Sequence, residues 1–263
     1  MDLKLDGRRA FVSGSTQGIG YAIARGLLAE GSSVVINGRN REKVDRAVHD
    51  LKAGSPDALV SGIVADFEDP RQTAQLVDAL GHVDILVNNV GRFELASFGD
   101  IGDDDWQRYF DVNVMSGVRL ARHALPSMLA NGWGRILFIG SESGVNVPAD
   151  MLHYGVTKAA MLALSNGLAK LTRGTEVTVN TILGGPTYSD GVADTVSALS
   201  QAQDIPTDAL KAAIIGGNTT SLLQRFIDPE EIANLALYLA SPRSSATNGA
   251  ALRADGGVLT TMI

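Results

Sequence analysis

The chain has 263 residues, 45% of them hydrophobic, and a formal net charge of −7. This length and apolar content suit one domain with a sizeable core, and the acidic balance argues against nucleic acid as a partner. The lack of cysteine excludes disulfides, a thiolate metal site and a cysteine nucleophile. We expect no transmembrane helix, because no run of 18 or more apolar residues occurs. We expect a cytoplasmic protein, because the first residues lack a signal-peptide pattern.

Short apolar runs alternate with amphipathic segments along the chain. The runs are continuous in Val, Ile and Leu, which is typical of buried parallel strands. Strict alternation of strands and helices predicts an α/β fold, a doubly wound parallel sheet flanked by helices on both faces. We predict strands at 8–14, 32–38, 58–66, 83–89, 134–140 and 176–182, and helices at 18–30, 42–53, 70–80, 103–130, 151–172 and 229–241.

One segment, roughly residues 186–228, interrupts this alternation. It is less regular and richer in Gly, Ser, Thr and Asp than the rest. Long insertions in compact domains often cover a site. We therefore expect a single domain over residues 1–263, with this segment as a substrate loop or lid.

A glycine-rich stretch, SGSTQGIG at 13–20, stands between the first predicted strand and the first predicted helix. Gly14 allows a tight turn, Gly18 lets the backbone approach a pyrophosphate, and Gly20 permits close helix packing. The helix start then offers free N–H groups to an anion. An ordinary strand–helix turn is the alternative, but the flanking elements favour a dinucleotide site.

The end of the second predicted strand, Asn37-Gly38-Arg39-Asn40, carries no acid. Enzymes that use NAD usually place an acid there to bind the ribose 2′-hydroxyl. Arg39 could instead pair with a 2′-phosphate, and Arg41 is a second candidate. The alternative is that both are solvated loop charges. The pattern favours NADP(H) as the cofactor and leaves NAD(H) open.

Tyr154 and Lys158 stand four residues apart in a predicted apolar helix. Residues at this spacing share a helix face, with Cβ atoms about 5–6 Å apart. A cation beside a phenol favours the phenolate and lowers the pKa of the tyrosine, which suits it to general acid–base work. A surface tyrosine beside a solvated lysine is the alternative for an isolated pair.

Further motifs accompany these in a fixed order. They are Asp66 after the third predicted strand, Asn88-Asn89-Val90-Gly91, Trp106 and Asn113 in DWQRYFDVNV, Ser141 after GRILFIG, VTVNTI, and ALRADGG near the end. With the glycine loop, Tyr154 and Lys158, they make the chain similar to the short-chain dehydrogenase/reductase family over nearly its whole length.

The resemblance implies a Rossmann-type sheet of about seven parallel strands. It also implies a catalytic set of Asn113, Ser141, Tyr154 and Lys158. Asp66 would contact adenine, and the backbone near Asn89 to Gly91 would run beside the ribose and nicotinamide. The full set of implied cofactor contacts is Gly14, Ser15, Thr16, Gln17, Gly18, Ile19, Gly20, Arg39, Asp66, Phe67, Asn89, Val90, Gly91, Tyr154, Lys158, Gly185, Thr187 and Ser189.

The family mechanism assigns each catalytic residue a role. Lys158 would bind the nicotinamide ribose and lower the pKa of Tyr154, which would exchange a proton with the substrate oxygen. Ser141 would orient that oxygen, and Asn113 would hold a water that links Lys158 to solvent. The cofactor would carry the hydride between a ketone and a secondary alcohol.

Three positions depart from the usual family pattern. Val90 replaces an alanine and is expected to crowd the adjacent pocket. After VTVNTI, Gly184 stands where the family has proline, and Ser189 stands where it has a threonine near the nicotinamide amide. Glycine does not fix φ as proline does, so a more flexible turn is expected.

The substrate is left open by these motifs. The family sets specificity in variable loops, here Arg92-Phe93-Glu94, Val145 to Leu152 and the segment after Tyr188. We expect a small carbonyl or alcohol substrate, with a 3-oxoacyl group on acyl carrier protein as an alternative. A non-catalytic NADP-binding regulatory or redox-sensing protein is the alternative outside enzymes. The dispersed histidines predict no metal site, and the resemblance implies a dimer or tetramer.

Overall fold

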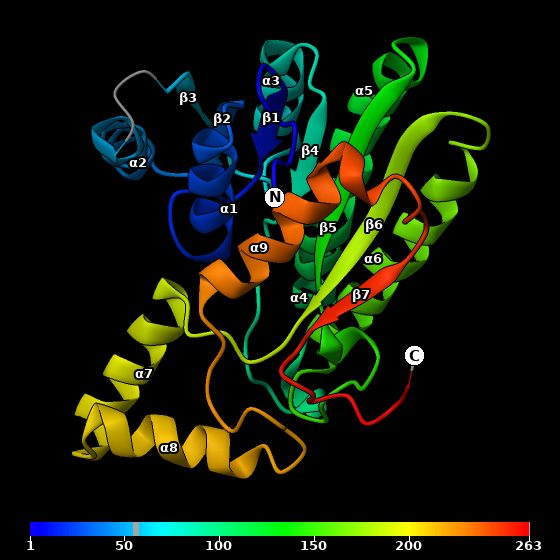
Figure 1. The fold of residues 1–263 in the computed structure, drawn as a ribbon. Coiled ribbons are helices and arrows are strands. Elements are labelled where there is room, and N and C mark those ends of the chain that lie inside the picture. Colours follow the sequence, from blue (N-terminus) through cyan, green and yellow to red (C-terminus); the bar gives the residue numbers. More distant parts are fainter. Residues whose placement is uncertain (55–57, 263) are drawn as a thin grey trace.

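The structure is a computed structural model that describes residues 1–54 and 58–262. Its centre is one parallel sheet of seven strands in the order β3-β2-β1-β4-β5-β6-β7 (Figure 1). The predicted doubly wound sheet is thus confirmed. The strands are β1 (Arg9–Val12), β2 (Ser33–Gly38), β3 (Val60–Val64), β4 (Ile85–Asn88), β5 (Trp133–Ser141), β6 (Glu176–Gly184) and β7 (Ala251–Ala254).

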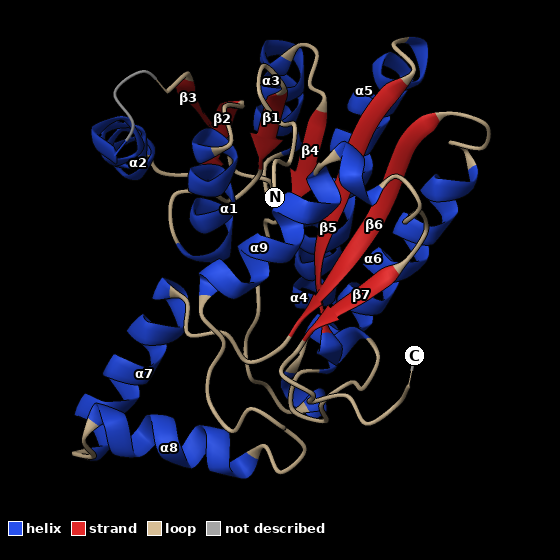
Figure 2. Ribbon diagram, viewed as in Figure 1, coloured by secondary structure: helices blue, strands red, loops and turns tan. Residues whose placement is uncertain are grey.

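Helices cover both faces of the sheet (Figure 2). Buried side chains of α1, α2 and α9 pack on one face, and those of α3, α5 and α6 pack on the other. The helix bounds are α1 (Gly18–Ala29), α2 (Arg41–Gly54), α3 (Pro70–Leu80), α4 (Asp103–Phe110), α5 (Ser116–Ala130), α6 (Leu152–Lys170), α7 (Asp190–Gln203), α8 (Thr207–Gly217) and α9 (Pro229–Ala240).

Strand order places a crevice at the carboxyl ends of β1 and β4. The chain runs from β1 outward through β2 to β3, then crosses back to β4 on the other side of β1. The connections on the two sides therefore leave in opposite directions, and ligands bind α/β sheets at such a switch point. The glycine loop follows β1, and the Asn89–Gly91 segment follows β4.

The predicted helix at 103–130 is not one regular α-helix. Its middle, Asp111–Met115, is a turn of π-helix between α4 and α5. Single π-helical turns widen a helix by one residue and often mark functional positions. Asn113 lies in this turn, and its side chain bonds to groups outside the helix.

The segment at 186–228 is more regular than the sequence suggests, because it contains the helices α7 and α8. Figure 1 shows this helical pair beyond the carboxyl ends of the strands. Its two ends meet in an isolated parallel bridge between Thr187 and Ile227. Backbone bonds of Tyr188 N–H to Ile227 O at 2.9 Å and of Ile227 N–H to Pro186 O at 2.8 Å complete this junction.

Among the residues described, no helix combines the length and the apolar character that a membrane crossing requires.

Candidate active site

The glycine loop is shaped by positions where no side chain fits. Gly14 and Gly18 have φ values of +59° and +60°, in the left-handed region that favours glycine. A Cβ on Gly14 would also lie 3.0 Å from Cα of Val90. A Cβ on Gly20 would lie 2.5 Å from Nδ2 of Asn89. The loop therefore packs directly against the backbone of Val90 and the side chain of Asn89, in the segment after β4.

Buried polar groups hold the loop in this shape. Gly14 N–H donates to Oδ1 of Asn37 at 3.1 Å, and Asn37 N–H donates to Oγ of Ser15 at 3.0 Å. Asn89 Nδ2 donates to the carbonyl of Gly14 at 2.8 Å. Asn37 belongs to the stretch at the end of β2 that carries no acid. Its side-chain amide accepts from the loop at Gly14 and donates to the carbonyl of Ile63 at 3.1 Å.

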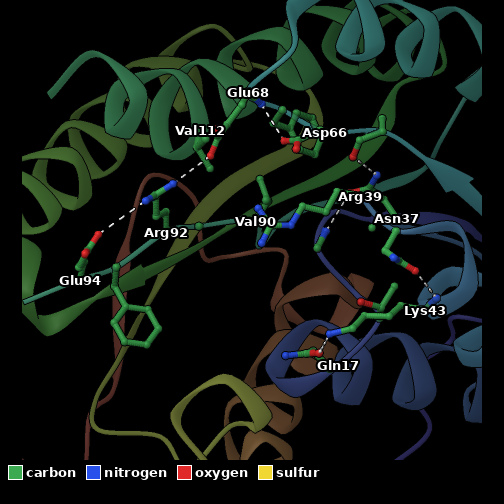
Figure 3. Close-up of a pocket in the computed structure, with 18 residues that line it drawn as sticks. Gln17, Asn37, Arg39, Lys43, Asp66, Glu68, Val90, Arg92, Glu94 and Val112 are labelled. Atoms are coloured by element: carbon green, nitrogen blue, oxygen red, sulfur yellow. Dashed lines mark hydrogen bonds and ion pairs between the residues drawn. The ribbon is translucent and has the colours of Figure 1, made fainter. Parts of the chain in front are cut away.

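A cavity of about 720 Å³ opens beside the loop (Figure 3). Arg39 and Lys43 contribute positive charge to its wall, and Lys43 Nζ donates to Oε1 of Gln17 at 3.4 Å. Arg41 does not line this cavity, and it pairs with Asp45 at 3.7 Å. The expected cofactor residues on this wall are Gly14, Thr16, Gln17, Arg39, Asp66, Phe67, Val90 and Gly91.

Arg92 lies between two carboxylates at the rim of this cavity, as Figure 3 shows. Its guanidinium is 3.1 Å from Oε1 of Glu68 and 3.6 Å from Oε2 of Glu94. Glu68 follows β3 and Arg92 follows β4, so this ion pair joins the loops on the two sides of the cavity. The pair is half-exposed, and such pairs contribute little stability on their own.

A second cavity of about 500 Å³ joins the glycine loop to the proposed catalytic residues. Ser141 ends β5, while Tyr154 and Lys158 lie in the first two turns of α6. These three residues line the cavity together. The expected cofactor residues on its wall are Gln17, Gly18, Ile19, Asn89, Gly91, Tyr154, Lys158, Gly185, Thr187 and Ser189.

Lys158 is buried, and its Nζ donates to the carbonyl of Ile139 at 2.8 Å. Burial lowers the pKa of Lys158 to about 8, although the charge of Glu142 opposes the shift. Burial also raises the pKa of the Tyr154 phenol; a hydrogen bond with Ser141 lowers it, and the charge of Glu142 raises it further. The expected lowered pKa of Tyr154 is therefore wrong in this structure. Desolvation of the phenolate outweighs the hydrogen bond with Ser141, while the Lys158 ammonium bonds to the Ile139 carbonyl.

Asn113 holds the segment after β4 in place. Its Oδ1 accepts from Arg92 N–H at 2.7 Å, and its Nδ2 donates to the Arg92 carbonyl at 3.0 Å and to Oγ1 of Thr157 at 2.9 Å. One lone pair of Oδ1 remains for a further donor. A Cβ on Gly91 would lie 3.5 Å from Nζ of Lys158 and 3.7 Å from Oδ1 of Asn113, so these three residues are neighbours.

Two carboxylates contact groups of the proposed site. Glu142 Oε2 accepts from Oγ of Ser141 at 2.6 Å. Asp190, the first residue of α7, accepts from the backbone N–H of Gly18 at 2.6 Å. Both contacts occupy polar groups that the expected chemistry uses.

Comparison with known proteins agrees with this arrangement. A family model described as Enoyl-(Acyl carrier protein) reductase matches residues 14–259. The Bacillus subtilis (strain 168) protein named "Uncharacterized oxidoreductase YvrD" is 45% identical over 263 residues, covering 98% of this chain and 99% of that protein. The chain belongs to the short-chain dehydrogenase/reductase family. The predicted resemblance is thereby confirmed.

Other members of the short-chain dehydrogenase/reductase family match along almost the full length. A D-beta-hydroxybutyrate dehydrogenase of Cupriavidus necator is 31% identical over 258 residues, covering 96% of this chain and 98% of that protein. The crystal structure of L-sorbose reductase from Gluconobacter frateurii, complexed with NADPH and L-sorbose, superposes with a TM-score of 0.94. It is 31% identical and covers 100% of both chains.

Three of the expected family site residues lie beneath the cavity walls. Ser15 is fully buried, and its hydroxyl donates to the Val12 carbonyl at 2.6 Å. Gly20 packs on Asn89, and Asn113 is buried behind Gly91. Their observed contacts position the loops that line the cavities.

Sequence reasoning missed three residues of this site: Lys43 and Glu142, which line the cavities, and Asp190, which bonds to Gly18. Lys43 lies four residues after Arg39, in the first turn of α2, and this spacing could have indicated a second cation at the same wall. Glu142 directly follows Ser141, and Asp190 directly follows Ser189, but adjacency in sequence does not show where a side chain points.

Proposed function

We propose that this chain is an NADP(H)-dependent oxidoreductase that interconverts a ketone and a secondary alcohol, with Tyr154 as the general acid and base. One observation carries the proposal: Ser141, Tyr154 and Lys158 converge on a cavity that is continuous with the glycine loop. A hydroxyl, a phenol and an ammonium at one carbonyl suit proton transfer and orientation.

The glycine loop and its two cavities fit a dinucleotide. The turn at Gly14 and Gly18 excludes side chains where a pyrophosphate would approach, and the start of α1 offers backbone N–H groups to an anion. Arg39 and Lys43 would hold the 2′-phosphate of NADP(H), since both are exposed on the wall of the first cavity. The NADPH in the sorbose reductase structure supports this choice of cofactor.

The bound cofactor would supply the hydride. Ser141 would orient the substrate oxygen, and Tyr154 would give its proton to that oxygen during reduction. Burial raises the pKa of the Tyr154 phenol, and the positive charges of Lys158 and of an oxidised nicotinamide would oppose this shift and bring the pKa toward the range that suits proton transfer. Lys158 would bind the ribose, and the free lone pair of Asn113 would hold a water that returns a proton to the site.

The decisive test is oxidation of NADPH, followed as loss of absorbance at about 340 nm, the reduced nicotinamide band, with a panel of ketones. NADH in parallel assays measures the cofactor preference. Turnover of no ketone, with intact NADPH binding, would favour the non-catalytic alternative.

A 3-oxoacyl substrate on acyl carrier protein is the second candidate, because a solved structure titled "Crystal structure of a putative betaketoacyl-ACP reductase" is 34% identical with a TM-score of 0.81. The places before β5 and β6 where carrier-dependent relatives tend to be basic hold Gly132-Trp133 and Thr175-Glu176 here. Equal turnover of a 3-oxoacyl thioester with and without the acidic carrier would exclude this second candidate.

A further inference from the structure

Glu142 places a carboxylate directly against the proposed catalytic serine. Its Oε2 accepts from Oγ of Ser141 at 2.6 Å, and its Oε1 accepts from Oγ of Ser143 at 3.2 Å. Both serines are buried, and Ser143 N–H also donates to Oγ of Ser141 at 3.1 Å. The carboxylate is thus fixed beside the position that a substrate oxygen would occupy.

The charge of Glu142 has no ion-pair partner among the residues that the structure describes. Of the described residues that line this cavity, Glu142 is the one acid and Lys158 the one cation. Lys158 directs its Nζ to the Ile139 carbonyl instead. The acid therefore has capacity to accept a further hydrogen bond from a bound molecule.

The rest of the cavity would bind an apolar group. Phe93 and Leu95 from the loop after β4, Met151 before α6, Val192 of α7 and Ile214 of α8 line it. Such walls favour a hydrocarbon portion of a substrate. A substrate that fits both features carries its polar groups at the carbonyl end, near Ser141 and Glu142.

The single proton of the Ser141 hydroxyl decides what kind of ketone can use it. A serine hydroxyl has one O–H to donate, and here Glu142 accepts it. A ketone oxygen needs that proton, and Glu142 then loses a donor unless the substrate supplies another. A hydroxyl on the carbon next to the carbonyl would lie within hydrogen-bond reach of Glu142 Oε2 and would donate the replacement hydrogen bond.

We propose that Glu142 is a specificity residue that selects ketones with a hydroxyl on the neighbouring carbon and excludes ketones with a carboxylate there. The inference rests on the proposed reductase function. The substrate hydroxyl donates to Glu142 and releases the proton of Ser141 for the carbonyl oxygen. A carboxylate in that position faces the charge of Glu142, and a methyl group leaves Oε2 of the acid without a donor.

Three ketones that share a phenyl group test this directly: 2-hydroxyacetophenone, propiophenone and phenylglyoxylate. The phenyl ring suits the apolar walls, and only the group next to the carbonyl differs. We expect the wild-type protein to prefer the hydroxy ketone in kcat/KM by about tenfold or more over propiophenone, and by about a hundredfold or more over phenylglyoxylate.

Glu142→Gln should lower the ratio of hydroxy ketone to phenylglyoxylate by about tenfold or more, because the amide can donate to the carboxylate. Glu230→Gln is the matched control, since it removes the same charge on α9, where Glu230 pairs with Arg25 outside both cavities. The control should keep the wild-type ratio. An unchanged ratio in Glu142→Gln, or an equal change in Glu230→Gln, overturns the proposal.

A binding measurement separates this inference from the proposed function. Tyr154→Phe with saturating NADPH should turn substrate over slowly enough for each ketone to be ranked by the rise in Tm that it produces. The hydroxy ketone should raise the Tm of Tyr154→Phe most. The double variant Tyr154→Phe/Glu142→Gln should show no such order. If the wild-type protein reduces no ketone but this order holds, the reductase function is wrong and the selectivity of Glu142 stands. If neither Tyr154→Phe nor the double variant ranks the ketones in this order, the proposed selectivity of Glu142 is wrong.

Discussion

The carboxylate of Asp190 accepts a hydrogen bond of 2.6 Å from the backbone N–H of Gly18. This N–H belongs to the start of α1, where the helix dipole favours an anion. A dinucleotide pyrophosphate would seek the same groups. Ser189 also approaches closely, since a Cβ on Gly18 would lie 3.2 Å from Cβ of Ser189. The first turn of α7 thus rests on the proposed phosphate site.

Asp190→Asn should strengthen NADPH binding, because it removes a negative charge that competes with the pyrophosphate. One charge near a helix N-terminus contributes up to about 1 kcal/mol, so the dissociation constant should fall by about fivefold. Fluorescence titration of the variant with NADPH measures this change. Asp194→Asn, a change to an exposed acid of the same helix, is the control and should have little effect. Weaker binding by Asp190→Asn would contradict the competition.

Arg39→Ala should weaken NADPH binding by about tenfold or more and leave NADH binding nearly unchanged, because only NADPH carries a 2′-phosphate. Lys43→Ala should act in the same direction with a smaller effect, since a lysine binds phosphate as a point charge. Arg41→Ala serves as the control because Arg41 pairs with Asp45 away from the cavity. Equal losses for both cofactors would show that neither side chain reads the 2′-phosphate.

Tyr154→Phe should lower turnover by about 10²–10⁴-fold, the usual contribution of a general acid or base. The ring remains, so cofactor binding and the melting temperature should change little. Lys158→Ala should instead reduce both turnover and NADPH affinity, because the lysine would also bind the ribose. Steady-state kinetics and NADPH titration distinguish the two variants. Near-normal ketone reduction by Tyr154→Phe would refute the mechanism.

The buried Lys158 should make stability depend on pH in a defined window. Its pKa is about 8 in the folded protein against an ordinary 10.5, so between these values the unfolded chain holds a proton that the folded protein lacks. Stability of the wild-type protein therefore gains a contribution as pH rises from 8 to 10.5. Lys158→Met lacks this gain, which amounts to at most about 3 kcal/mol.

Urea unfolding of both proteins at pH 7 and pH 10 measures the effect. The variant also leaves the Ile139 carbonyl without its donor, which costs about 1–3 kcal/mol at either pH. The unfolding free energy of Lys158→Met minus that of the wild type should consequently be higher at pH 7 than at pH 10. If this difference in unfolding free energy is the same at both pH values, burial does not lower the pKa of Lys158.

The protein should form a dimer or tetramer through α5 and α6. The outer face of α6 exposes Val156, Ala163 and Gly167, a flat surface on which another helix can pack closely. Light scattering should return a multiple of 27.6 kDa. Ala163→Arg should shift that mass toward the monomer, whereas a change at the exposed Lys170 should not. A wild-type mass near 27.6 kDa would contradict the prediction.

The sheet was predictable because each buried strand is a run of Val, Ile and Leu, and the ALRADGG motif that carries the seventh strand was recognised through the family resemblance. The closeness of Tyr154 and Lys158, two residues of the proposed catalytic set, was predictable because residues four apart share a helix face whatever surrounds them. The π-helical turn at Asn113 was not, because it depends on bonds to Arg92 and Thr157 in other elements. The raised pKa of Tyr154 depends on burial, and the position of Lys43 depends on the path of the loop before α2.

The bridge between Thr187 and Ile227 allows the α7–α8 segment to change in sequence independently of the sheet. Because both ends of the α7–α8 excursion meet at one backbone junction, its length and sequence can change while the strands keep their register. Closing a longer loop costs only a little more entropy. The α7–α8 segment can therefore be replaced as a unit. A replacement would change the apolar side chains that line the second cavity and would leave the glycine loop and Tyr154 in place.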